Sequence, residues 1–316
     1  MKFKTHIFNF SLCTLLLCHV VLFSQTFTSS NLPIVVLKKT QSWQQIDSAW
    51  DGFEIVVDMG IIDNGPGKRN NITDPFNNYQ GKVSIKVQGS SSVGWPKRSF
   101  RITTLNAMNV GTDVSLLGMP PHEDWVLKAL YQDKSFLRDD LGHKIFRDMG
   151  HYSSRSRFFE MVIDGEYRGV YQLLEKVKRD RGRVNISKMT QADVSGDDLT
   201  GGYIISLDKF VPGVDKGWHS KYKSNATGDS ANFYLYIYPN PDSIMPQQMN
   251  YIKNYVDQFE DAMMAPDLSK SNYQRFIDVP SFADNFILTE LCRNVDGYRS
   301  STFFHKDKAS SGNGKL

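Results

Sequence analysis

A β-hairpin between residues 158 and 174 constrains the fold of this chain more than any other segment. Residues 158–163 and 167–174 are strand-forming runs rich in apolar side chains, and Asp164-Gly165 stands between them. An Asp-Gly pair between two such runs favours a tight turn with positive backbone φ angles. We therefore expect the two runs to pair as antiparallel strands.

Further strands are predicted where polar and apolar residues alternate, because alternation is typical of a half-buried strand. The clearest cases are residues 81–88 and 98–103, which flank a loop of small residues. Apolar residues spaced three and four apart instead indicate helices. The remaining strands are expected at 32–38, 53–59, 201–208 and 233–238, a strand or helix entry at 125–130, and helices at 133–149 (with Asp133 as N-cap), 247–264 and 279–291. This order predicts an α+β protein with a strand-rich N-terminal part and a helical C-terminal part.

The first 25 residues have the layout of a secretory signal peptide. Lys2 and Lys4 form a short positive region, an apolar stretch follows as far as Phe23, and small polar residues come next. The apolar stretch is short for a permanent span, which needs roughly 20 apolar residues. We predict a protein that is secreted or held on the cell surface, without a membrane span after cleavage; an uncleaved anchor is the alternative.

Removal of this leader changes the charge and the number of cysteines. The whole chain has 37 Lys+Arg and 34 Asp+Glu, and loss of Lys2 and Lys4 lowers its net charge from +3 to +1. A charge so close to zero gives no reason to expect nucleic acid as a partner. Cys292 is the one cysteine outside the leader, and its apolar helical surroundings predict a buried small hydrophobic residue.

Several polar residues occur in the order that a phosphoryl-transfer site requires. Such a site needs a small-residue loop near phosphate, a cation beside the loop, and acidic residues for Mg²⁺ and the acceptor. The loop at residues 89–92 is followed by Lys97, with which Asp139 or Asp140 could pair, and Asp296 follows the last apolar helix. Each of these features also fits an ordinary turn, an exposed charge or a helix cap. By themselves they indicate an anion site on a secreted α+β protein.

Longer sequence blocks run in order from about residue 32 to the end of the chain. They are Ile85-Lys-Val-Gln-Gly-Ser-Ser-Ser, Trp95-Pro-Lys-Arg-Ser-Phe-Arg, Asp124-Trp-Val-Leu, Asp133-Lys-Ser-Phe-Leu-Arg, Glu160-Met-Val-Ile-Asp-Gly-Glu-Tyr-Arg-Gly-Val-Tyr-Gln-Leu-Leu-Glu-Lys, Gly201-Gly-Tyr-Ile, Ile277-Asp-Val-Pro-Ser-Phe and Glu290-Leu-Cys-Arg-Asn-Val-Asp. These blocks resemble the CotH kinase family of atypical secreted protein kinases. The resemblance implies a kinase domain over residues 26–316 with a two-lobed, protein-kinase-like fold. Its strand-rich lobe would span about 32–178, and its helical, incomplete lobe about 179–316.

The resemblance also implies a reaction, namely transfer of phosphate from ATP, with Mg²⁺ or Mn²⁺, to Ser or Thr of secreted or surface proteins. It makes Lys97 the phosphate-contacting lysine. Asp296 would be the acid of the catalytic loop, which orients the acceptor hydroxyl or contacts the metal. Ser301 stands where many kinases have a metal-binding asparagine. The other implied nucleotide-binding positions are Gly89, Ser90, Ser91 and Ser92 above the phosphates, Arg138, and Glu175 near the adenine-side connection.

Two departures from the family pattern suggest an alternative function. Serine at position 301 is a poorer Mg²⁺ ligand than asparagine. The family has an acidic Trp-Asp-x-Asp-like segment soon after this region, but the chain ends at Leu316, so we expect a truncated fragment of low activity. The alternative is a catalytically inactive surface-binding or structural protein with a kinase-like fold. A third interpretation, a polysaccharide-associated surface protein, rests on aromatic residues such as Trp218 and Tyr234.

Overall fold

The computed structural model describes residues 27–42, 44–48, 53–89, 91–223, 231–267, 269 and 271–316. The signal peptide predicted at residues 1–25 lies outside these ranges. No helix within them is long and apolar enough to cross a membrane.

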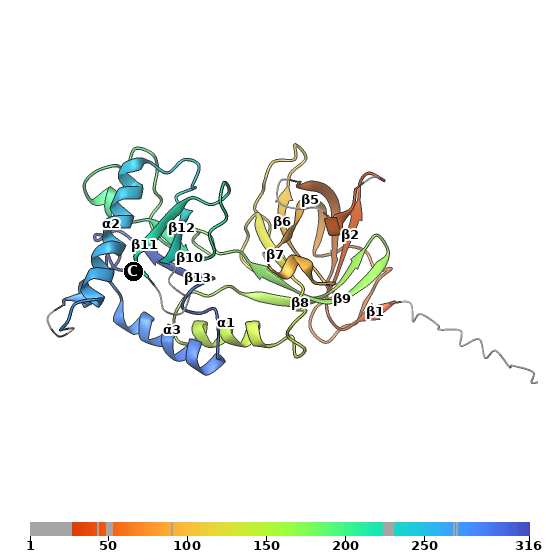
Figure 1. Cartoon of the computed structure of the whole chain (residues 1–316). Helices are drawn as coiled ribbons and strands as arrows, with labels where there is room; N and C mark the ends of the chain where they lie inside the picture. Colours follow the sequence, from red (N-terminus) through yellow and green to blue (C-terminus); the bar gives the residue numbers. More distant parts are fainter. Residues whose placement is uncertain are drawn as a thin grey trace, which may run out of the picture.

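Seven strands close into a barrel, on the right in Figure 1. Neighbouring strands are antiparallel except β2 and β8, whose parallel pairing joins residues 34–37 to residues 160–163 and closes the barrel. The predicted hairpin is confirmed as β8 and β9, and both turn residues, Asp164 and Gly165, have positive φ angles. In spatial order the strands are β2 (Ile34–Lys39), β3 (Ile55–Ile62), β5 (Tyr79–Gln88), β6 (Ser99–Leu105), β7 (Asp124–Lys128), β9 (Glu166–Glu175) and β8 (Ser156–Ile163).

Alternate side chains of these strands point into the barrel and form its core. Val83 and Ile85 of β5 pack with Phe100 and Ile102 of β6 and with Trp125 of β7, and all five are fully buried. The residues between them point outward, since successive side chains of a strand lie on opposite faces. This alternation is the reason that the sequence pattern predicts the strands.

A second, four-stranded antiparallel sheet follows the barrel in the chain. Its order is β11 (Gly217–Lys223), β12 (Ala231–Tyr238), β10 (Tyr203–Leu207) and β13 (Thr302–Lys306). Helix α2 (Pro246–Met263) packs Ile252 and Val256 into the same hydrophobic core as Tyr203 and Tyr236. Trp218 and Tyr234 also lie in this core, stacked with ring centroids 5.1 Å apart. A polysaccharide surface built on these two rings is therefore not supported.

Helices α1 (Arg138–Asp148) and α3 (Val279–Cys292) lie side by side below the sheet in Figure 1. The apolar side chains Phe286, Ile287 and Leu291 of α3 are exposed. Cys292 is exposed as well, so the prediction that it is buried is wrong. Its apolar neighbours in the sequence form an uncovered helix face among the described residues, not a core. The shorter elements are β1 (Ser29–Ser30), β4 (Asn70–Asn71), η1 (Ile46–Ser48), η2 (Ser91–Gly94), η3 (Asp197–Thr200) and η6 (Tyr273–Arg275).

The predicted two-lobed, kinase-like α+β fold with a helical C-terminal lobe is wrong. The N-terminal strands form a closed barrel, and four more strands follow residue 178, among which β11 and β13 were not predicted. The described residues contain three α-helices, of 11, 18 and 14 residues. Local patterns identify single strands, but barrel closure depends on pairing between segments that are distant in the sequence.

Candidate active site

The loop of small residues joins β5 to β6. Gly89 has φ +133°, and a Cβ atom at this position would lie 2.0 Å from Ser92 Oγ, so only glycine fits. Ser91 and Ser92 begin the short helix η2, and Ser90 lies outside the described residues. The loop therefore has a fixed turn at Gly89, but the structure does not test whether it contacts phosphate.

Lys97 follows this loop and turns its side chain toward the barrel wall. Its ammonium group donates a hydrogen bond to the carbonyl of Val170 in β9 and lies 4.4 Å from the ring centroid of Tyr171. Burial lowers the pKa of Lys97 to about 8, against the charge of Glu160. The suggested pairing with an acidic residue of α1 is wrong, since Asp139 binds Lys128 and Asp140 accepts a hydrogen bond from Ser156.

Glu175, at the end of β9, is a buried partner of an arginine. Its carboxylate accepts hydrogen bonds from the Arg155 backbone N–H at 2.9 Å and from the Arg155 guanidinium at 2.7 to 3.0 Å. The glutamate is 1% exposed. Arg138, at the start of α1, has the opposite character, because its side chain is 87% exposed and only its Nε approaches Asp133, at 3.7 Å.

Asp296 lies on the exposed turn that follows α3. Its Oδ1 is 3.4 Å from Arg299 Nη2, and its backbone N–H donates to Asn294 Oδ1. Ser301, exposed and with φ +55°, immediately precedes β13. Asp296 and Ser301 are therefore close in the chain and both accessible to a ligand.

A third polar residue near this turn was not named as a site residue from the sequence. Asp208 follows β10, and because Leu207 pairs with Thr302, Asp208 and Ser301 stand at the same end of the β10–β13 ladder. Burial raises the pKa of the Asp208 carboxyl, and the negative charges of Asp215 and Asp296 add to this effect. The bond that Asp208 accepts from the Lys209 backbone N–H at 2.8 Å opposes it. The signal in the sequence was an aspartate directly after an apolar strand.

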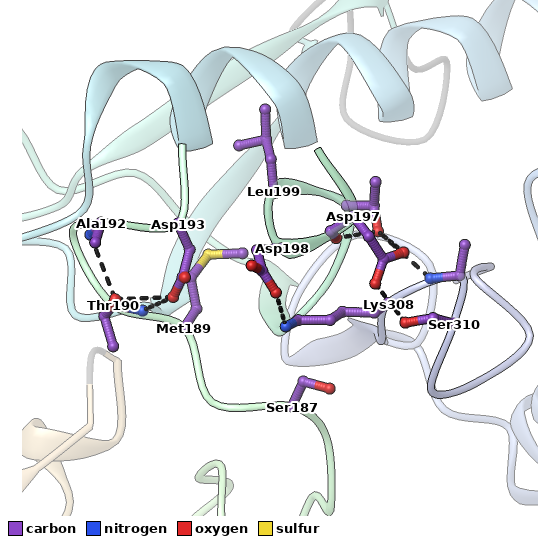
Figure 2. A network of polar contacts seen from close by, with 12 residues as sticks. Ser187, Met189, Thr190, Ala192, Asp193, Asp197, Asp198, Leu199, Lys308 and Ser310 are labelled. Atoms are coloured by element: carbon purple, nitrogen blue, oxygen red, sulfur yellow. Dashed lines mark hydrogen bonds and ion pairs between the residues drawn. The ribbon is translucent and has the colours of Figure 1, made fainter. Parts of the chain in front are cut away.

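The opposite end of the same sheet is fixed by a polar network (Figure 2). Lys308 forms an ion pair with Asp198, and Ser310 donates a hydrogen bond to Asp197, both in the segment around η3. Thr190 donates to Asp193 through its backbone N–H and its hydroxyl, at 2.6 and 2.9 Å. The Lys308 and Ser310 contacts fasten the chain after β13 to the segment that precedes β10, whereas the Thr190–Asp193 bonds close a turn within one loop.

The predicted site residues thus fall into two groups. Lys97 and Glu175 belong to the barrel, whereas Asp296 and Ser301 adjoin the second sheet. In the described part of the chain, no hydrogen bond or ion pair joins Lys97 to Asp296. No group of three or more His, Cys, Asp or Glu residues suited to a metal occurs there either.

Comparison with known protein families assigns the chain to one family. The profile of the CotH kinase protein family matches residues 85–315, which cover most of the sequence and include Lys97, Glu175 and Asp296. The chain belongs to this family, and its family relationship points to ATP-dependent phosphotransfer in general. A search of curated proteins gave no significant match.

Proposed function

We propose that this protein is an ATP-dependent Ser/Thr kinase of the CotH type that acts on secreted or cell-surface proteins. The family match over residues 85–315 is the observation that supports the proposal most strongly. The arrangement proposed for the chain is a signal peptide at residues 1–25 and one kinase region at residues 26–316. Extracytoplasmic location is part of the proposal and rests on the sequence pattern of the leader.

The chemistry centres on Asp296. Its carboxylate is exposed and, among the residues that the structure describes, forms an ion pair with Arg299 alone, so it is free to accept a hydrogen bond from the hydroxyl of an incoming Ser or Thr. A carboxylate in this role orients the hydroxyl and receives its proton as the phosphoryl group is transferred.

Oxygen ligands for Mg²⁺ or Mn²⁺ are present beside Asp296. Mg²⁺ is usually held by one or two carboxylates together with water and substrate phosphates, so Asp208, Asp296 and the Ser301 hydroxyl fit such an ion. The metal would supply charge neutralisation for the phosphates of ATP. The half-buried position of Asp208 fits a metal ligand better than a solvated charge, because a cation would compensate its desolvation.

A transfer assay with radiolabelled ATP tests the proposal on protein expressed from the complete gene, with a generic Ser/Thr-rich protein acceptor. We expect Asp296→Ala to lower the rate about 100-fold or more, the usual contribution of a general base. Lys97→Ala tests the phosphate contact implied by the family. Asp148→Ala, at an exposed carboxylate of α1, is the matched control and should retain the wild-type rate. Equal rates for the wild type and Asp296→Ala would exclude a catalytic role for Asp296.

The serine at position 301 favours a second candidate function. In this case the protein is inactive and binds nucleotide or a partner without transferring phosphate. The hydroxyl of serine is a poorer metal ligand than the amide of asparagine. This candidate predicts that ATP binds and that no acceptor is labelled under any metal condition.

A further inference from the structure

The turn that carries Asp296 has two buried residues. It runs from residue 293 to residue 301, between α3 and β13, and its residues are exposed except Gly297 and Ser300. The carbonyl of Asp296 accepts hydrogen bonds from the backbone N–H groups of Arg299 and Ser300, at 3.1 and 2.9 Å. These bonds make the turn a compact unit, so a shift of its buried residues moves the Asp296 carboxylate as well.

Gly297, the residue after Asp296, packs directly on helix α3. A Cβ atom on Gly297 would lie 2.5 Å from Thr289 Cγ2 and 3.1 Å from Thr289 Oγ1, whereas carbon atoms in contact are about 3.5 to 4.0 Å apart. Thr289 is a β-branched residue of the helix and is 6% exposed, so its side chain has few alternative rotamers. A side chain at position 297 would therefore push the turn away from α3.

A hydrogen bond from the second sheet holds the same glycine from another side. The hydroxyl of Thr302, the first residue of β13, donates to the Gly297 carbonyl at 2.8 Å. Thr302 is paired with β10 at the end of the ladder where Asp208 stands. Asp296 lies close enough to Asp208 for its charge to help raise the pKa of that carboxyl. The glycine thus links α3 to the end of the sheet at which the two carboxylates meet.

We propose that Gly297 is a positioning residue for Asp296. Its lack of a side chain lets the turn approach Thr289, and this contact fixes where the Asp296 carboxylate stands relative to Asp208 and Ser301. The inference rests on the proposed function, because it concerns the carboxylate that orients the acceptor or contacts the metal. A displacement of about 1 Å at such a group can lower a rate about 100-fold. A glycine that served packing alone would affect stability but not the rate of transfer.

The transfer assay on protein expressed from the complete gene separates the two roles. We expect Gly297→Ala to lower kcat about tenfold or more and to leave KM for the protein acceptor within about threefold of the wild type. Thr289→Ser removes the Cγ2 atom that the new methyl group would meet, so the double variant should recover kcat to within about threefold of Thr289→Ser alone. Gly60→Ala is the matched control, since its Cβ atom would clash with the ring of Phe76 in the barrel, and it should keep the wild-type kcat.

A second variant needs no extra space and therefore tests the proposal even if Gly297→Ala does not fold. Thr302→Val keeps the shape of the side chain and removes the hydrogen bond to the Gly297 carbonyl. We expect it to lower kcat severalfold, while thermal unfolding shows that the variant remains folded at the assay temperature.

Calorimetric titration with Mn²⁺ alone gives a readout that does not depend on transfer. We expect Gly297→Ala to weaken Mn²⁺ binding about tenfold, as changes behind metal ligands usually do, and Thr289→Ser to restore it in the double variant. If the wild type binds Mn²⁺ but transfers no phosphate, the kinase proposal fails, and this loss and recovery of affinity would still establish the positioning role.

Three results would overturn the proposal. The first is a lower midpoint of thermal unfolding in Gly297→Ala with unchanged kcat and Mn²⁺ affinity, because it would assign the glycine to packing alone. The second is a fall in kcat that Thr289→Ser does not rescue, because the contact with Thr289 would then not be responsible. The third is a wild type that neither binds Mn²⁺ nor transfers phosphate, and this result would overturn the proposed function as well.

Discussion

Arg155 surrounds the carboxylate of Glu175 with three donor groups, its backbone N–H, Nε and Nη2, at 2.7 to 3.0 Å. Both oxygens of the carboxylate are used, and the glutamate side chain has no solvent exposure. The pair ties the start of β8 to the end of β9. This arrangement explains Glu175 as a structural ion pair without reference to a nucleotide.

Glu175→Gln should therefore destabilise the protein by roughly 3 kcal/mol, because it leaves the Arg155 guanidinium without its counter-ion. Urea unfolding measures the change. Glu166→Gln is the control, since Glu166 pairs with Arg168 at 3.0 Å but is 74% exposed, and it should cost less than about 0.5 kcal/mol. A loss of ATP affinity in Glu175→Gln at unchanged stability would instead support the nucleotide-binding role predicted from the sequence.

Asp124 makes the stability of the barrel sensitive to acid. Burial alone would raise the pKa of this carboxyl, but Lys178 at 2.8 Å and the Thr103 hydroxyl at 2.9 Å outweigh burial and lower the pKa to about 2. Because the pKa is lower in the folded state than in the unfolded state, this stabilisation is complete above pH 4 and is lost as the pH falls toward 2.

The contribution of Asp124 amounts to about 2 kcal/mol. Asp124→Asn should remove it, so the variant should lose less stability than the wild type between pH 4 and pH 2 in urea unfolding. Asp148→Asn, at a side chain that is 62% exposed, should follow the wild type. Parallel curves for the wild type and Asp124→Asn would show that the ion pair does not carry the effect.

Ser301 has a strained backbone conformation, and its hydroxyl is a weak ligand for Mg²⁺. Its φ of +55° lies in the left-handed region, which asparagine and glycine adopt more readily than serine. Ser301→Asn and Ser301→Gly should both relieve this strain, but only asparagine adds an amide oxygen for Mg²⁺. In the transfer assay, we expect Ser301→Asn to lower the Mg²⁺ concentration for half-maximal rate severalfold, and Ser301→Gly to leave it unchanged. Equal effects of the two variants would attribute the change to the backbone alone.

Local sequence patterns predicted most single elements of this fold. The alternation in residues 81–88 and the Asp164-Gly165 turn correspond to β5 and to the β8–β9 hairpin. The closure of the barrel was not predicted, because β2 pairs with β8 across more than 100 intervening residues and no local pattern encodes that contact. β13 was missed for a related reason, since its five residues become a strand only by pairing with the distant β10.

The residues of the candidate site were also predictable from the sequence only in part. Lys97 and Asp296 were named from short motifs, and the structure describes their surroundings without testing their roles. Asp208 was not named as a site residue, because its interest lies in neighbours brought close by strand pairing. The burial of Glu175 could not be predicted from the sequence either, because it depends on Arg155, which strand pairing brings beside it.

Glycine-to-alanine substitutions test how closely the residues after β13 pack against the residues just before β10. A Cβ atom on Gly201 would lie 1.9 Å from Lys308 N and 2.0 Å from the Asp307 carbonyl carbon, so backbone would have to move. Gly201→Ala should destabilise the protein by about 2 kcal/mol, as overpacking does. Gly142, in α1, has open space around its Cβ position. There alanine should stabilise the protein by about 0.5 to 1 kcal/mol through its higher helix propensity. Thermal unfolding of both variants gives the two signs, and a neutral Gly201→Ala would mean that the chain after β13 does not approach β10 so closely in solution.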